Sequence, residues 1–173
     1  TAVTLALALA FEPPEAAVMA RPPRRTNASL IPEGLGWRVI IVAVAMLIGT
    51  LGLFLRELAD GRDLAEARTL AINTLVLFEV WYLFSARRLR ESALNRSGLF
   101  GNRIVLIAGV AIVVAQLLFT YAPPMQLLFD TRALGPTEWL MAVAVSLPII
   151  AVAEGHKAWQ RRRGVGLTTG VGR

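Results

Sequence analysis

Two acidic residues stand in apolar surroundings where acids are rare. Glu79 lies near the middle of the apolar run 70–86, and Glu154 lies at the edge of the run 137–153. On insertion scales, an acid at the middle of a membrane helix costs about 3 kcal/mol. A partner, a proton or a bound cation must offset that cost. Glu79 is therefore the first candidate for a cation site, and the structural alternative is a protonated Glu79 that hydrogen-bonds a neighbouring helix.

The residues around these acids offer little further chemistry. Tyr82 is the one hydrogen-bonding side chain that helical spacing places beside Glu79, which makes Tyr82 a weak second candidate. Glu154 is followed by the chain's single histidine, His156, and by Lys157, a pattern typical of a solvated helix end or an ion pair. A nucleotide-binding glycine loop, a nucleophile–base pair and a cluster of metal ligands are all absent from the sequence. We therefore expect no catalytic residue and no bound cofactor in this chain.

Long apolar segments position these residues. A membrane-spanning helix needs about 20 mostly apolar residues, and four runs meet or approach that length: residues 37–55, 70–86, 104–122 and 137–153. A shorter apolar stretch, residues 2–11, resembles the second half of another helix. The sequence predicts an all-α, polytopic membrane helix bundle with four full spans and the end of a preceding one. Pro148 should kink the last span.

Basic residues alternate between the connections. Fourteen of the 18 bases flank the runs in segments 12–38, 87–103 and 157–173, whereas the other two loops carry four bases among several acids. Lys and Arg are retained on the cytoplasmic side of membranes. The three base-rich segments, including the C-terminus, are therefore predicted to be cytoplasmic.

Composition excludes other classes of protein. Hydrophobic residues make up 55% of the 173 residues, and there is no cysteine, so disulfides and thiolate metal sites are excluded. The net charge of +6 could suggest a nucleic-acid partner, but the bases adjoin apolar runs on one side and no binding motif accompanies them. We therefore expect the lipid bilayer, and no nucleic acid, as a partner. The abundance of Arg and Ala favours a prokaryotic plasma membrane.

Three stretches resemble a known family. FEPPEAAVMARPPR (11–24), LVLFEVWYLFSAR (75–87) and YAPPMQLLFDTRALGPTEWLMAVAVSLPIIAVAE (121–154) are similar to the C-terminal membrane region of P-type cation-transporting ATPases, in the calcium-pump and sodium-pump branch. The resemblance implies that residues 1–11 end the sixth membrane helix and that 12–36 form a cytoplasmic loop. It further implies that 37–156 form the seventh to tenth helices and that 157–173 form a basic cytoplasmic tail without fixed structure.

The resemblance also implies a function. The chain would support and partly line the ion site of an ATP-driven cation pump. ATP, Mg²⁺, upstream helices and cytoplasmic domains would belong to the full-length polypeptide, whose phosphorylation and nucleotide domains lie before Thr1. A purely structural support domain and a free-standing four-span carrier or scaffold are the alternatives.

Family site residues carry over at few positions. Glu79 matches a cation-binding glutamate of the eighth helix, and Thr1 matches a threonine beside the ion site on the sixth. Ala2 stands where calcium and sodium pumps have an aspartate, and residues 2–11 contain no carboxylate. Because hard cations bind several oxygen ligands, this departure favours fewer ions, a different ion, or a proton on Glu79.

Overall fold

A computed structural model describes residues 2–10, 33–86 and 103–162, and every regular element in these ranges is an α-helix. The predicted all-α class is therefore confirmed. Four helical segments are long and apolar enough to cross a membrane: Leu35–Ala59, Leu64–Ala86, Arg103–Tyr121 and Pro136–Trp159. The predicted loops at 12–32 and 87–102, the tail from 163 and the candidate Thr1 lie outside the described ranges.

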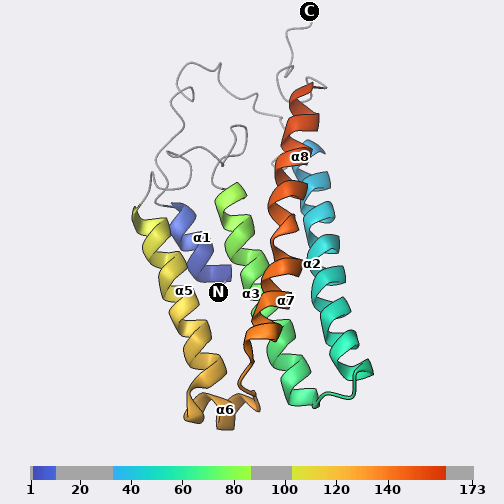
Figure 1. Cartoon of the computed structure of the whole chain (residues 1–173). Helices are drawn as coiled ribbons and strands as arrows, with labels where there is room; N and C mark the ends of the chain where they lie inside the picture. The colour runs from blue at the N-terminus through green and yellow to red at the C-terminus, as the bar shows by residue number, and fades with distance from the viewer. Residues whose placement is uncertain (1, 11–32, 87–102, 163–173) are drawn as a thin grey trace, which may run out of the picture.

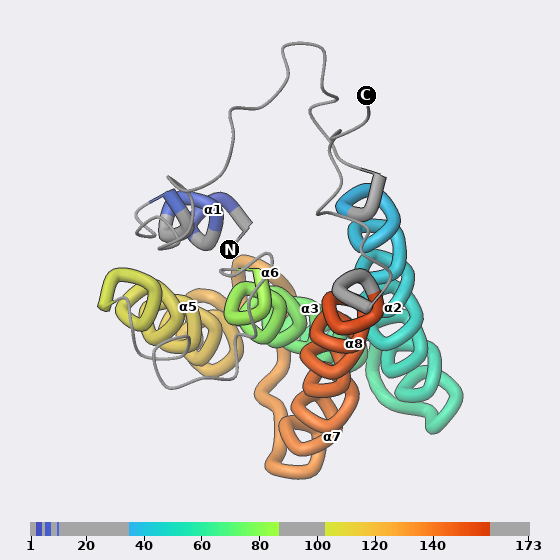
Figure 2. The backbone as a smooth tube through the Cα atoms, turned by 90° about the horizontal axis from the view of Figure 1, so that it is seen from above, coloured from blue at the N-terminus to red at the C-terminus, as the bar shows by residue number. Residues whose placement is uncertain are grey.

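The helices pack around one central member, α3 (Figures 1 and 2). They are α1 (Ala2–Ala10), α2 (Glu33–Ala59), α3 (Leu64–Ala86), α5 (Arg103–Tyr121), α6 (Pro123–Phe129), α7 (Pro136–Ser146) and α8 (Pro148–Arg162). On one side α3 contacts α2, α7 and α8, and on the other side it contacts α1 and α5. Figure 2, which looks down the bundle, shows α3 between these two groups.

Alternate helices run in opposite directions. Figure 1 shows the α2–α3 turn and α6 at one end of the bundle. The start of α2, the end of α3, the start of α5 and the end of α8 lie at the other end. We call these the acidic end and the basic end, after the predicted loop charges. The arrangement agrees with the alternation that the loop charges predict.

Two helix boundaries differ from the sequence prediction. Helix α2 begins at Glu33 rather than near Trp37, and α8 continues to Arg162 instead of ending near Gly155. Helix α2 thus begins before the apolar run 37–55. At the other boundary, Lys157 is buried against α3, so packing maintains the helix past Gly155.

The proline pair after the third span both ends one helix and starts another. Helix α5 ends at Tyr121, and Pro123 and Pro124 occupy the first turn of α6, where their missing N–H groups cost nothing. The sequence predicted a turn or short interfacial helix between Met125 and Pro136, and the helix starts two residues earlier. Asp130 ends α6 in the left-handed conformation with φ 51°.

The predicted kink at Pro148 is present as a break between α7 and α8. Leu147 keeps helical angles, and its N–H still donates to the carbonyl of Val143 at 2.9 Å. Pro148 has no N–H to donate to Ala144 four residues earlier, so the ladder is interrupted at this point. Nearby, the Trp81 indole donates to the Ser146 hydroxyl at 3.1 Å and joins the break to α3.

Candidate functional site

Glu79 lies on the least covered face of the central helix. Helical spacing places it with Ile72 and Leu75, each of which is 40% exposed. The other faces of α3 carry the buried residues, packed against α2, α7 and α8 on one side and against α5 on the other. The face that carries Glu79 is thus the one that this set of helices leaves open.

The Glu79 carboxylate is only partly satisfied. Its Oε2 atom is buried and has no hydrogen-bond partner in the described part of the chain. An unpartnered carboxylate oxygen at bilayer depth is expensive. The bundle as described therefore does not account for the retention of an acid at this position.

The second candidate, Tyr82, has a different neighbour. The guanidinium of Arg38 lies over the Tyr82 ring, with Cζ 5.4 Å from the ring centroid. This is a cation–π contact between α2 and α3. The structure therefore connects Tyr82 to an arginine, and it brings no partner to Glu79 Oε2.

The third candidate, Thr1, cannot be placed. The helix that follows it, α1, packs beside α3 and α5. Among its described side chains, Thr4 is exposed and offers a hydroxyl, and Val3 and Leu7 are exposed apolar residues. Helix α1 thus supplies no carboxylate next to the Glu79 helix.

Four buried or partly buried polar side chains join α2, α3 and α8 near the basic end. We call them the Ser85 cluster: Arg38, Ser85, Glu154 and Lys157. Lys157 Nζ donates to the backbone oxygen of Ser85 and to Glu154 Oε1, both at 2.6 Å. The Ser85 hydroxyl donates to the same carboxylate oxygen at 2.8 Å and accepts from Arg38 Nη2 at 3.5 Å.

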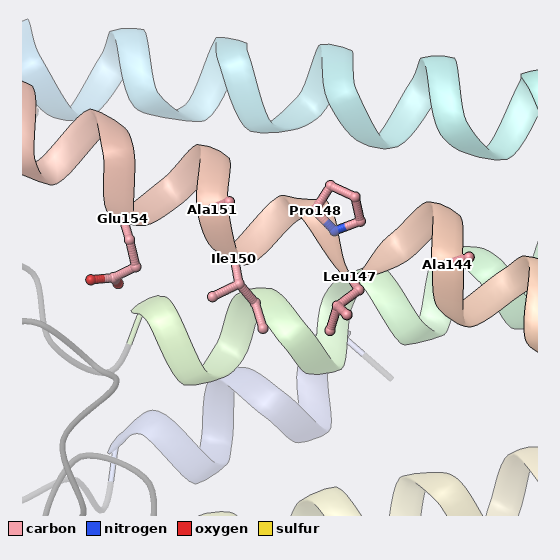
Figure 3. A pocket seen from close by; sticks show the side chains of 6 residues that line it. All are labelled: Ala144, Leu147, Pro148, Ile150, Ala151 and Glu154. Atoms are coloured by element: carbon pink, nitrogen blue, oxygen red, sulfur yellow. The ribbon is translucent and has the colours of Figure 1, made fainter.

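Glu154 and Lys157 form an ion pair, which is one of the two arrangements that the sequence indicated. The sequence did not indicate that Lys157 would be only 2% exposed. Glu154 also ends an apolar groove of about 520 Å³ beside the Pro148 break (Figure 3). The groove residues are Ala144, Leu147, Pro148, Ile150, Ala151 and Glu154.

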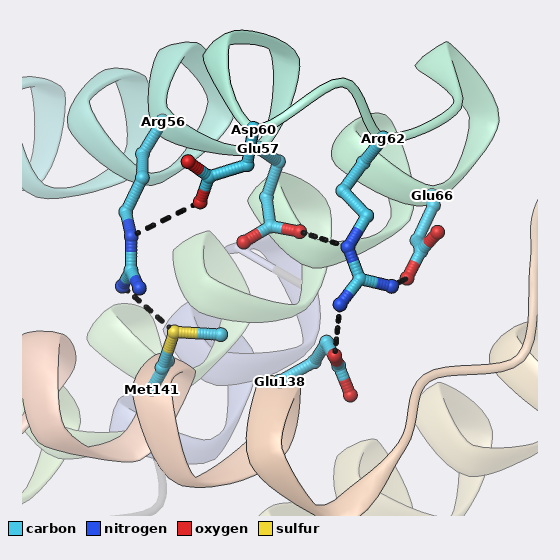
Figure 4. Close-up of polar contacts among 7 residues, drawn as sticks. All are labelled: Arg56, Glu57, Asp60, Arg62, Glu66, Glu138 and Met141. Atoms are coloured by element: carbon cyan, nitrogen blue, oxygen red, sulfur yellow. Dashed lines mark hydrogen bonds and ion pairs between the residues drawn. The ribbon is translucent and has the colours of Figure 1, made fainter.

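A second charged cluster joins α2, α3 and α7 at the acidic end (Figure 4). Arg62 lies 2.9 Å from Glu66, 3.5 Å from Glu138 and 3.9 Å from Glu57, measured between side-chain nitrogen and oxygen atoms. Glu57 and Glu138 are 2% and 7% exposed. Arg62 is therefore the shared cation of two buried carboxylates.

A neutral network holds α5 to α3 near the same end. The Asn73 amide donates to the Thr120 hydroxyl at 3.0 Å and to the Thr69 carbonyl at 2.8 Å. The Thr69 hydroxyl accepts the backbone N–H of Arg132 at 3.0 Å. These side chains form packing contacts between α3, α5 and the segment before α7.

The described residues contain no group of three or more His, Cys, Asp or Glu side chains that could hold a metal ion. Glu79 therefore lacks, within those ranges, the carboxylate neighbours that a divalent cation would need. Helices able to cross a membrane, an acid at mid-helix and charged clusters at both ends are typical of part of an ion transporter.

Comparison with known proteins narrows that class. The chain belongs to the family described as "Cation transporting ATPase, C-terminus", whose model matches residues 1–159. It is 40% identical over 156 residues to the probable cation-transporting ATPase F of Mycobacterium tuberculosis, covering 89% of this chain and 17% of that protein. It is 31% identical to calcium-transporting ATPase 1 of Schizosaccharomyces pombe, over 92% of this chain and 18% of that protein.

A human relative is aligned over similar shares of the two sequences. Calcium-transporting ATPase type 2C member 1 is 29% identical over 91% of this chain and 17% of its own length. The chain thus spans less than a fifth of these relatives. The family resemblance that the sequence indicated is confirmed, and the chain is an integral membrane segment of that family.

Proposed function

We propose that this chain forms the C-terminal membrane part of an ATP-driven P-type cation pump and contributes Glu79 to, or beside, the ion site. ATP and Mg²⁺ act in cytoplasmic domains of the full-length protein. The relatives are named as cation-transporting or calcium-transporting ATPases, which supports this class of activity. The transported cation, the bilayer and the upstream helices of the same polypeptide are the partners.

The buried, unpartnered Oε2 of Glu79 carries the proposal. Ile72 and Leu75, on the same face of α3, are each 40% exposed, so upstream helices can pack against this face. A cation or a proton at this carboxylate would offset the cost of its burial. The hydroxyls of Thr1 and Tyr82 are weaker candidates as neighbouring oxygen ligands.

We propose that this pump binds fewer ions, or a different ion, than a calcium pump whose membrane site contains several carboxylates. Helix α1 contains no acidic residue, so it can offer the site only carbonyl and hydroxyl oxygens. Such a site favours few charges: a single cation, or a proton carried by the carboxylate.

Charge neutralisation at Glu79 tests the role directly. In the full-length protein, Glu79→Gln should lower the apparent affinity for the activating ion in ATPase and transport assays and change its pH dependence. Glu66→Gln, on the same helix but ion-paired with Arg62 at the acidic end, is the matched control and should leave ion affinity unchanged. Wild-type ion affinity and pH dependence in Glu79→Gln would leave only the support role.

The orientation is a separate proposal, with the basic end in the cytoplasm of a prokaryotic cell. The chain has no cysteine, which makes labelling of introduced ones simple. In a full-length protein freed of cysteines, Asp60→Cys should react with impermeant maleimide from outside intact cells. Ala158→Cys should react only after permeabilisation. Labelling of both positions from one side would contradict the model.

A further inference from the structure

Arg38 is buried without an anionic partner. It is 3% exposed, and no carboxylate of the described ranges lies within ion-pair distance of its guanidinium. Besides the Tyr82 ring under its guanidinium, it makes one long hydrogen bond, from Nη2 to the Ser85 hydroxyl at 3.5 Å, and its Nε is buried with no partner in those ranges. Burial of an arginine in this state is unfavourable unless an anion neutralises it.

A second donor in the same region is also unsatisfied. Both ring nitrogens of His156 are buried and lack a partner in the described structure. His156 precedes Lys157 on α8, and Lys157 and Arg38 both bond Ser85, so His156 and Arg38 lie at the same end of the bundle. The carboxylate of Glu154 in the Ser85 cluster bonds Ser85 and Lys157. Two nitrogen donors of one region therefore lack an acceptor.

Exposed indoles place these donors at headgroup depth. Trp37, next to Arg38, is 56% exposed, and Trp159 is 44% exposed with its ring 5.8 Å from that of His156. Trp side chains favour the membrane–water interface. Basic pockets between membrane helices on the cytoplasmic side bind phosphorylated lipid headgroups.

We propose that Arg38 and His156 form a binding site for a phosphate-bearing anion, and that the phosphodiester of an anionic phospholipid in the inner leaflet is its occupant. The phosphate oxygens would accept from Arg38 Nε and a His156 ring nitrogen after a small movement of the guanidinium. Free phosphate has the same chemistry and is the other possible source. This site is remote in function from Glu79 and does not depend on the proposed cation role.

Lipid titration of the full-length protein tests the proposal. Native mass spectrometry in detergent measures binding of phosphatidylglycerol, with phosphatidylcholine as the neutral lipid and inorganic phosphate as the free anion. Arg38→Gln should weaken phosphatidylglycerol binding about tenfold, the loss expected for one charge-assisted hydrogen bond. Arg56→Gln, on the same helix but ion-paired with Asp60 at the opposite end, should bind as the wild type does.

Each outcome decides the proposal. If inorganic phosphate binds or competes and this depends on Arg38, the anion site stands but its occupant is free phosphate rather than lipid. Equal binding of phosphatidylcholine, or equal phosphatidylglycerol binding by the wild type and Arg38→Gln, would overturn the site and leave a carboxylate elsewhere in the full-length protein as the counter-ion. If Arg38→Gln fails to fold, His156→Gln takes its place, and undiminished phosphatidylglycerol binding by that variant would also overturn the site.

Discussion

Replacement of Glu154 by Gln should destabilise the bundle through a residue one turn away. The Glu154 carboxylate lies 2.6 Å from Lys157 Nζ, and the Lys157 side chain is only 1% exposed. Gln keeps the size of the side chain and removes its charge. The ammonium group would remain buried between α3 and α8, with the Ser85 backbone oxygen still accepting a hydrogen bond from it.

The size of the effect follows from this geometry. Loss of one partner of a buried ion pair costs about 3–5 kcal/mol, and the retained Ser85 carbonyl places Glu154→Gln near the lower value, about 3 kcal/mol. Lys157→Met should cost less, about 1 kcal/mol, because the Glu154 side chain is 13% exposed and keeps the Ser85 hydroxyl donor. The double variant should lie close to Lys157→Met alone, since it buries no unpaired charge.

The assay is a double-mutant cycle that compares the free energy of unfolding of the full-length variants in detergent. Unfolding is monitored as the loss of the folded size-exclusion peak on heating or on titration with denaturant. The expected order of stability is wild type, then Lys157→Met and the double variant together, then Glu154→Gln. Equal losses for the two single variants that add in the double variant would refute the reasoning, because additivity means that the two side chains do not interact.

Two other substitutions test the packing of α3. Gly49→Val should cost about 1–3 kcal/mol of unfolding free energy by overpacking, because a Cβ there would lie 2.6 Å from Phe78 Cζ. A Cβ at Gly52 meets no atom within 4 Å, so Gly52→Val should fold as the wild type does in the same melts. Arg62→Gln should cost about 2 kcal/mol of unfolding free energy, because two buried carboxylates lose their shared cation. Arg132→Gln is the control: Arg132 pairs with Asp63, their side chains are 68% and 56% exposed, and the loss should be less than about 0.5 kcal/mol. A Gly49→Val bundle as stable as Gly52→Val, or an Arg62→Gln bundle as stable as Arg132→Gln, would contradict the described α3 contacts.

The helices could be predicted because the bilayer leaves few alternatives. A run of apolar residues near the span length must be helical, since lipid offers the backbone no hydrogen-bond partner. The break at Pro148 and the corner at Pro123 follow from the missing N–H of proline. Boundaries were less accurate at Glu33 and Arg162. At the second boundary, the burial of Lys157 against α3 keeps the chain helical beyond the apolar run.

Buried charges could not be predicted in the same way. Arg38 and Lys157 entered the sequence argument as bases at the ends of apolar runs, which carry topology information and are usually solvated. Their burial depends on Ser85, which lies 47 and 72 residues away in the chain. Glu57 and Glu138 were likewise interpreted as loop charges, and the salt bridges through Arg62 reveal their burial. Spacing along one helix gives no indication of such contacts.

Neither charged cluster includes Glu79, whose buried Oε2 has no hydrogen-bond partner among the described residues. The Ser85 cluster fixes α3 to α2 and α8 near the basic end, and Arg62 fixes the starts of α3 and α7 to the end of α2 at the acidic end. Both sets of contacts lie on the side of α3 away from Glu79. Helix α3 is therefore fixed to its neighbours mainly through its other faces. This would favour the proposed ion site at Glu79, because the free energy of ion binding would then not be used to order the helix that carries the ligand.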